Sequence, residues 1–168
     1  SPNVHLGFAP TKEGSFYIGA ATHRDYYCFD SGSDDIGPVP LGMDKCASHP
    51  DWQYHDLELM LLAAREQGVP MIIGSAGDTG TNSRVDMYVD MIRDMAKKHG
   101  LKKFELAYFY SEVDKEYLRR KMLAGEKIEG LNSRSDLTIE ELDATTRIVA
   151  VAGVHPFIKA REMGADVM

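Results

Sequence analysis

The sequence has two cysteines, few clustered basic residues and no long apolar run. Cys28 and Cys46 lack the spacing of a metal site, so we expect free thiols in a reducing compartment. No stretch approaches the roughly 20 apolar residues that cross a bilayer. With no signal peptide before the first expected strand, these absences favour the cytoplasm and exclude a membrane partner.

Positive charge is also scarce. The 168 residues contain 19 Lys and Arg against 26 Asp and Glu, for a net charge of -7. A nucleic-acid partner is therefore excluded, because such a surface normally shows clustered basic residues. The loop SAGDTG lacks the three-glycine spacing of a dinucleotide site, and no GKS or GKT sequence occurs, so NAD and ATP are disfavoured as cofactors.

The most informative stretch is YYCFDSGSDDIGPVPLG at residues 26–42. Its first residues, including Cys28, predict a strand buried on both faces, because they form a short apolar run bounded by turn residues. After Asp30 the glycines and prolines cannot continue the strand. The stretch therefore predicts a loop at the carboxyl end of a strand, where open α/β sheets bind ligands.

Strands alternate with amphipathic helices along the chain. We expect strands at 4–8, 26–30, 69–74, 104–110, 148–151 and 165–168, and helices at 15–24, 54–67, 83–100, 113–124, 138–145 and from Pro156. Ser83 with Asp86 and Thr138 with Glu141 predict capping boxes at the starts of two of these helices. This order predicts a single α/β domain over residues 1–168, a three-layer Rossmann-like fold with a mostly parallel sheet. Because the last strand ends with the chain, we expect a continuation or a partner chain to complete the fold.

Four small-residue loops, at 30–37, 75–80, 111–114 and 153–156, should meet at one edge of this sheet. Helix N-termini and hydroxyls at such an edge favour an anion, either a phosphate or a carboxylate. The candidate substrate-binding residues are Asp30, Ser31, Gly32, Ser33, Asp34, Ser75, Gly77, Thr79, Ser111 and Gly153.

The same loops contain candidate proton carriers, namely Asp78, Glu112 and His155. His155 alternatively caps the helix that begins beside it. The acids of these loops suit a hard cation such as Mg²⁺, or else they fold their own loops through bonds to the backbone. Both alternatives stay open.

Four stretches carry a family resemblance: YYCFDSGSDDIGPVPLG, HDLELMLLAAREQGVPMIIGSAGDTG, YSEVDKEYLRRKM and AGVHPFIKAREMGADV. In their order and spacing the chain resembles the amino-terminal part of the acyclic terpene utilisation (AtuA-like) family. The resemblance implies a soluble bacterial catabolic protein found in pathways that degrade branched acyclic compounds through carboxylates or their coenzyme A thioesters. It also implies a longer architecture, with a further α/β portion and often a small ferredoxin-like domain.

Together these patterns predict an enzyme subunit of lyase or hydratase type that binds a small anionic metabolite or an acyl-CoA. The alternative is a non-catalytic binding or scaffolding subunit that docks a partner chain through an open sheet edge. In either case we expect a homo-oligomer or a complex with a partner chain.

Overall fold

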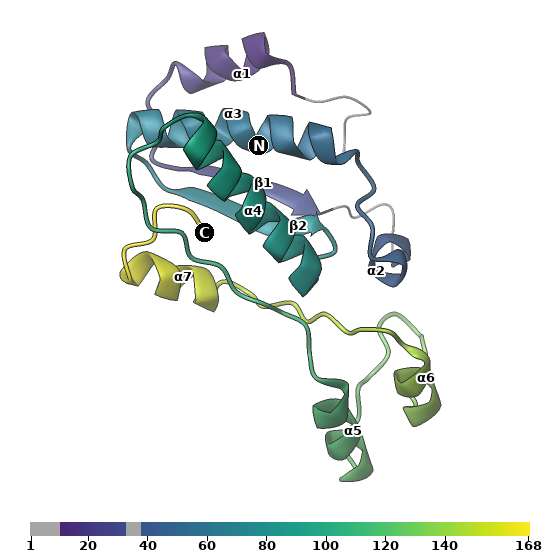
Figure 1. Cartoon of the computed structure of the whole chain (residues 1–168). Coiled ribbons are helices and arrows are strands. Elements are labelled where there is room, and N and C mark those ends of the chain that lie inside the picture. Colours follow the sequence, from purple (N-terminus) through teal and green to yellow (C-terminus); the bar gives the residue numbers. More distant parts are fainter. Residues whose placement is uncertain (1–10, 33–37) are drawn as a thin grey trace. The chain divides into compact units, whose positions relative to one another are not determined.

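The computed structural model describes residues 11–32 and 38–168 (Figure 1). Contacts divide the chain into two compact units, one formed by the residues up to Tyr110 together with Ala152–Met168 and the other by Ser111–Val151. The first unit contains α1 Glu13–Ala20, β1 Tyr27–Gly32, α2 Val39–Met43, α3 Pro50–Gln67, β2 Met71–Asp78, α4 Asn82–Lys98 and α7 His155–Glu162. The second contains α5 Lys115–Leu123 and α6 Ile139–Ala144. The strand expected at residues 4–8 lies outside the described residues.

The centre of the first unit is a parallel sheet. β1 pairs with β2 in parallel, with Tyr27 opposite Met71 and Asp30 opposite Gly74. Val167 bridges to both Met71 and Leu106, again in parallel. The extended end of the chain thus lies in parallel between β2 and residues 105–107, but only isolated bridges join these segments, and the regular strands expected at 104–110 and 165–168 do not form.

Helices cover both faces of this sheet. Met71 is fully buried in a core that includes Leu57 and Leu61 of α3 and Ile92 of α4. The next residue of β2, Ile72, packs instead against a smaller cluster that includes Ala160 of α7. Because successive strand residues point to opposite faces, α7 lies on the face opposite α3 and α4, as Figure 1 shows. The α/β class is confirmed.

Local signals fix the ends of α3. Pro50 occupies its first turn, and His49 Nδ1 accepts a hydrogen bond from the Asp51 amide at 3.2 Å. Gly68 ends the helix in the left-handed conformation, with φ of 67°. Glycine adopts this conformation at little steric cost, and the backbone bonds of such a cap satisfy the last carbonyls of the helix. The end predicted for this helix is confirmed, whereas its start lies four residues before the predicted Tyr54.

Burial of β1 on both faces is wrong. Tyr27, Phe29 and Ser31 are buried, but Cys28 and Asp30 between them are exposed. The alternation means that only one face of β1 is covered by helices. Both cysteines are free thiols, as predicted.

The second unit is held by a helix cap and a short antiparallel pair. Thr138 and Glu141 form the predicted capping box, with bonds of 3.1 and 2.9 Å between each side chain and the other residue's backbone amide. Val149 pairs antiparallel with Glu112. The prediction that residues 148–151 add a strand to the parallel sheet is therefore wrong, because their backbone bonds go to Ser111 and Val113 of the same unit.

Candidate functional site

Seven of the predicted site residues lie together where β1 and β2 end. This strand-end cluster consists of Asp30, Ser31, Gly32, Ser75, Gly77, Asp78 and Thr79. Asp30 lies opposite Gly74 and Gly32 opposite Asp78, so β2 contains an irregular insertion at this point. Ser75 and Asp78 adopt positive φ angles of 51° and 73°. Irregularities of this kind bend a strand and redirect its side chains.

Ser31 links the two strands below this insertion. Ser31 is fully buried, and its hydroxyl lies 2.9 Å from the carbonyl oxygens of both Gly74 and Ser75. A serine placed this way holds the backbone of the turn. Its predicted role in substrate binding stays a prediction.

Tyr88 of α4 lies under the cluster. Its side chain is buried, and its hydroxyl donates to Gln53 Oε1 at 3.1 Å. Burial raises the pKa of the phenol above its usual value, and the nearby Cys46 and Asp78 add to the rise. Hydrogen bonds from the Ser31 side chain and the Gly77 amide act in the opposite direction. Tyr88 therefore stays protonated at neutral pH as a buried donor.

The segment 44–48 is tied to the end of β2 and the start of α4. Asp78 Oδ2 accepts a hydrogen bond of 2.5 Å from the Ala47 amide. Arg84 Nη1 donates to Cys46 Sγ at 3.6 Å, and Gln53 Nε2 donates to Ser48 Oγ at 2.9 Å. These contacts come from three separate elements, and they place the segment over the turn between β2 and α4.

The carboxylate of Asp44 lies at the N-terminus of α4. Asp44 Oδ1 accepts hydrogen bonds from Ser83 Oγ at 2.8 Å and from Thr81 Oγ1 at 3.2 Å. Arg84 Nε lies 3.7 Å from the same oxygen. A helix N-terminus favours a negative charge, because its amides are unpaired and its dipole is positive there. The start of α4 thus already holds a carboxylate, supplied by a distant part of the chain. The capping box predicted from Ser83 and Asp86 is wrong, because the Ser83 hydroxyl bonds Asp44 instead.

Arg84 reaches this site across Gly77. A Cβ atom on Gly77 would lie 3.1 Å from Arg84 Cβ and Cδ, so the glycine makes room for the arginine side chain. Within residues 11–32 and 38–168 the guanidinium donates only to sulfur, at Cys46 Sγ and at Met87 Sδ, 3.8 Å away. Sulfur is a weak acceptor. Arg84 therefore keeps donor capacity for an oxygen ligand.

The other predicted residues belong to other segments of the chain. Ser111 and Glu112 belong to the second unit. Gly153, with φ of 69°, and the exposed His155 lie at the start of α7. Ser33 and Asp34 are outside the described residues. The meeting of all four loops at one edge stays a prediction.

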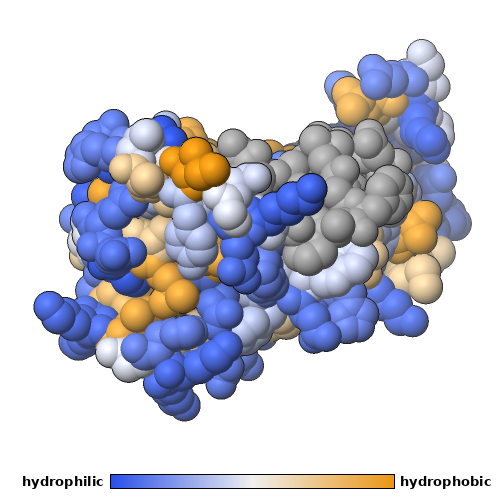
Figure 2. All heavy atoms as spheres, turned by 90° about the horizontal axis from the view of Figure 1, so that it is seen from above, coloured by the Kyte–Doolittle hydropathy of each residue, from blue (hydrophilic) through white to orange (hydrophobic). Residues whose placement is uncertain are grey.

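Two properties of the described part of the chain bear on ligands and location. It contains no group of three His, Cys, Asp or Glu side chains arranged to hold a metal ion. None of its helices combines the length and the apolar character needed to cross a bilayer. The face in Figure 2 is mainly hydrophilic, with apolar side chains scattered between polar ones.

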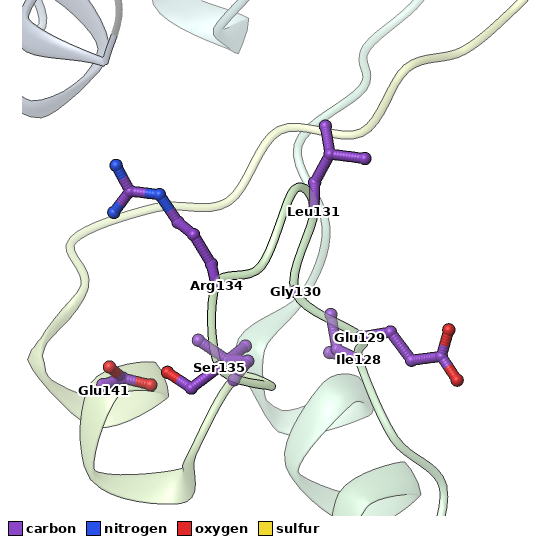
Figure 3. Close-up of a pocket in the computed structure, with 8 residues that line it drawn as sticks. Ile128, Glu129, Gly130, Leu131, Arg134, Ser135 and Glu141 are labelled. Atoms are coloured by element: carbon purple, nitrogen blue, oxygen red, sulfur yellow. The ribbon is translucent and has the colours of Figure 1, made fainter.

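The second unit has a hollow of its own, with a volume of about 560 Å³. Its lining comes from the loop after α5 and from the start of α6: Ile128, Glu129, Gly130, Leu131, Arg134, Ser135, Leu137 and Glu141. Figure 3 shows the Glu129 and Arg134 side chains pointing away from each other. The hollow therefore does not focus charges of one sign on a ligand.

Sequence reasoning missed Asp44, Arg84 and Tyr88. Tyr88 fits the apolar stripe of α4, and nothing local marks its hydroxyl. Arg84 did leave a signal, since the first turn of α4 has no acid and an arginine there opposes the helix dipole. A cation in that position indicates that a negative group comes from elsewhere. Comparison with protein-family models, with curated proteins and with solved structures finds no match for the chain.

Proposed function

We propose that the chain is an enzyme subunit that binds a small carboxylate or an acyl-thioester where β1 and β2 end. One observation supports this most directly: the start of α4 holds the carboxylate of Asp44 between two hydroxyls and Arg84. The same donors suit the carboxylate or thioester oxygen of a metabolite, because hydrogen bonds to a charged group are short and strong. The ligand in this proposal is therefore a small organic anion.

Lyase or hydratase chemistry requires a group that moves a proton next to the bound carbonyl. Asp78 is our proposed carrier, because its carboxylate lies in the strand-end cluster and bonds the segment 44–48. The buried phenol of Tyr88 lies beneath it and stays neutral, with its proton donated to Gln53. Glu112 and His155 remain proposed proton carriers.

The wider setting is also a proposal. We assign the first unit to a three-layer Rossmann-like fold, supported by α3 and α4 on one sheet face and α7 on the other. Membership of the acyclic terpene utilisation (AtuA-like) family, catabolic action in the cytoplasm and assembly into a homo-oligomer complete it. The resemblance in the four stretches given above supports the family membership and the catabolic action.

The test is the melting temperature of the protein with acetate, coenzyme A and acetyl-coenzyme A. A ligand that binds only the folded state raises the melting temperature. We expect at least one of these compounds to do so, and Arg84→Gln to abolish the rise. Arg93→Gln is the matched control, because Arg93 lies on the same helix with an exposed side chain paired to Asp90. Equal rises in both variants, or no rise in the unsubstituted protein, would refute the proposal.

The exposed face of β1 favours the second candidate, a scaffolding subunit that docks a partner chain through its sheet. Cys28 is exposed there, and the neighbouring Tyr26 is 58% exposed. Light scattering after size exclusion separates the two functions. A monomer or stable homo-oligomer with a ligand-dependent melting temperature supports the enzyme, whereas dependence on another chain without any ligand response supports the scaffold.

A further inference from the structure

We infer that Asp44 is an internal occupant of the anion site, so that the described conformation is self-inhibited and a ligand binds by displacing the Asp44 carboxylate. This inference rests on the proposed function, because it concerns the regulation of the same site. It assigns to the segment 44–48 the role of a movable cover over the ends of β1 and β2.

The first support is that Asp44 engages the donors a ligand would need. The hydroxyls of Ser83 and Thr81 both donate to Asp44 Oδ1, and Ser83 also lies 3.1 Å from Oδ2. Thr81 is fully buried, so its hydroxyl has little access to solvent water. A ligand carboxylate and the Asp44 carboxylate cannot accept from these hydroxyls together, since each hydroxyl has a single proton.

The second support is that Asp44 satisfies Arg84 poorly. Arg84 Nε is buried and, among the described residues, has no acceptor within hydrogen-bonding distance, since Asp44 Oδ1 lies 3.7 Å away. Guanidinium groups prefer paired bonds to both oxygens of a carboxylate. An untethered ligand can adopt that geometry, whereas Asp44 is fixed by its backbone. The arrangement thus favours exchange of Asp44 for a ligand.

The third support is the backbone at Asp44. Asp44 ends α2 with φ of 50° and ψ of 47°, a left-handed conformation that is uncommon for residues other than glycine. α2 has five residues, of which only Pro40 is buried. The cover is therefore joined to a short, weakly packed helix, and its contacts with α4 are polar. An element of this kind opens at a smaller cost than a packed core helix.

The experiment is an acetate titration followed by NMR at the backbone amides of Ser83 and Arg84. Asp44→Gly removes the carboxylate and suits the left-handed backbone. Asp44→Asn keeps the shape of the side chain without its charge, which covers the case in which the glycine variant folds poorly. Asp90→Asn is the control, because it removes the same charge from an exposed residue of α4.

We expect Asp44→Gly and Asp44→Asn to bind acetate about tenfold or more tightly than the unsubstituted protein, because a ligand that must displace an occupied state has a reduced apparent affinity. Asp90→Asn should bind as the unsubstituted protein does. Equal acetate affinity in all four proteins would overturn the inference and leave the proposed function standing. If no protein, with or without Asp44, binds acetate at these amides, both the inference and acetate-type binding at this site fail.

Discussion

Replacing Tyr88 by phenylalanine tests whether a buried polar network stabilises the site. Tyr88 is 3% exposed and its partner Gln53 is 1% exposed. Their bond of 3.1 Å is closed to solvent. The substitution keeps the ring and removes only the oxygen, so Gln53 Oε1 loses this donor in a place that water does not reach easily.

The expected loss of stability is about 1–3 kcal/mol, the cost of leaving one buried polar group unsatisfied. With a dependence on urea of about 1–3 kcal/mol per molar, the unfolding midpoint should fall by roughly 1 M. Far-UV circular dichroism during urea unfolding measures this midpoint. Tyr110→Phe is the matched control, because Tyr110 is 49% exposed and its bond to Asp86 lies at the surface.

We expect Tyr110→Phe to change the stability by less than about 0.5 kcal/mol, as is usual for surface substitutions. Equal, small effects in the two variants would refute the claim that a closed network supports the strand-end cluster. A large loss of stability in Tyr110→Phe alone would mean that the stabilising hydroxyl is the one bonded to Asp86 and not the one bonded to Gln53.

Two further predictions concern other parts of the chain. Hydrogen bonding to Asp56, aided by Glu13, raises the pKa of His55 above 6.5, although burial opposes the rise. The stability gained from charged His55 is therefore fully present below pH 6.5, and it is lost as the pH rises through the raised pKa. Urea unfolding on both sides of that value should show the loss, and His55→Gln should remove it. Thr138→Ala should destabilise α6 by about 1 kcal/mol. Hydrogen exchange at the Glu141 amide should then become faster, and an unchanged rate would contradict the role of the capping box.

Local signals in the sequence were sufficient for several element ends. Gly68 and the Thr138–Glu141 pair act within one turn of their own helix, so the residues that define these ends are neighbours in sequence. The parallel pairing around Val167 followed from the alternation of strands and helices. The fold class was predictable because these signals are repeated along the chain.

Long-range contacts account for what the sequence did not reveal. Ser83 looks like a local cap, but a carboxylate 39 residues away takes its hydroxyl. Residues 148–151 have the composition of a buried parallel strand, yet they pair antiparallel with Glu112 in a separate unit. The predicted residues at the ends of β1 and β2 do lie together, while Asp44 and Arg84 were missed because each is defined by its distant partner.

A crystal structure of Asp44→Gly grown with acetate tests the central claim most directly. We expect an acetate carboxylate at the start of α4, bonded by the hydroxyls of Thr81 and Ser83 and facing Arg84. An ordered α4 start without acetate at saturating concentration, or with Arg84 turned away from it, would contradict the claim that this end of the sheet binds carboxylates.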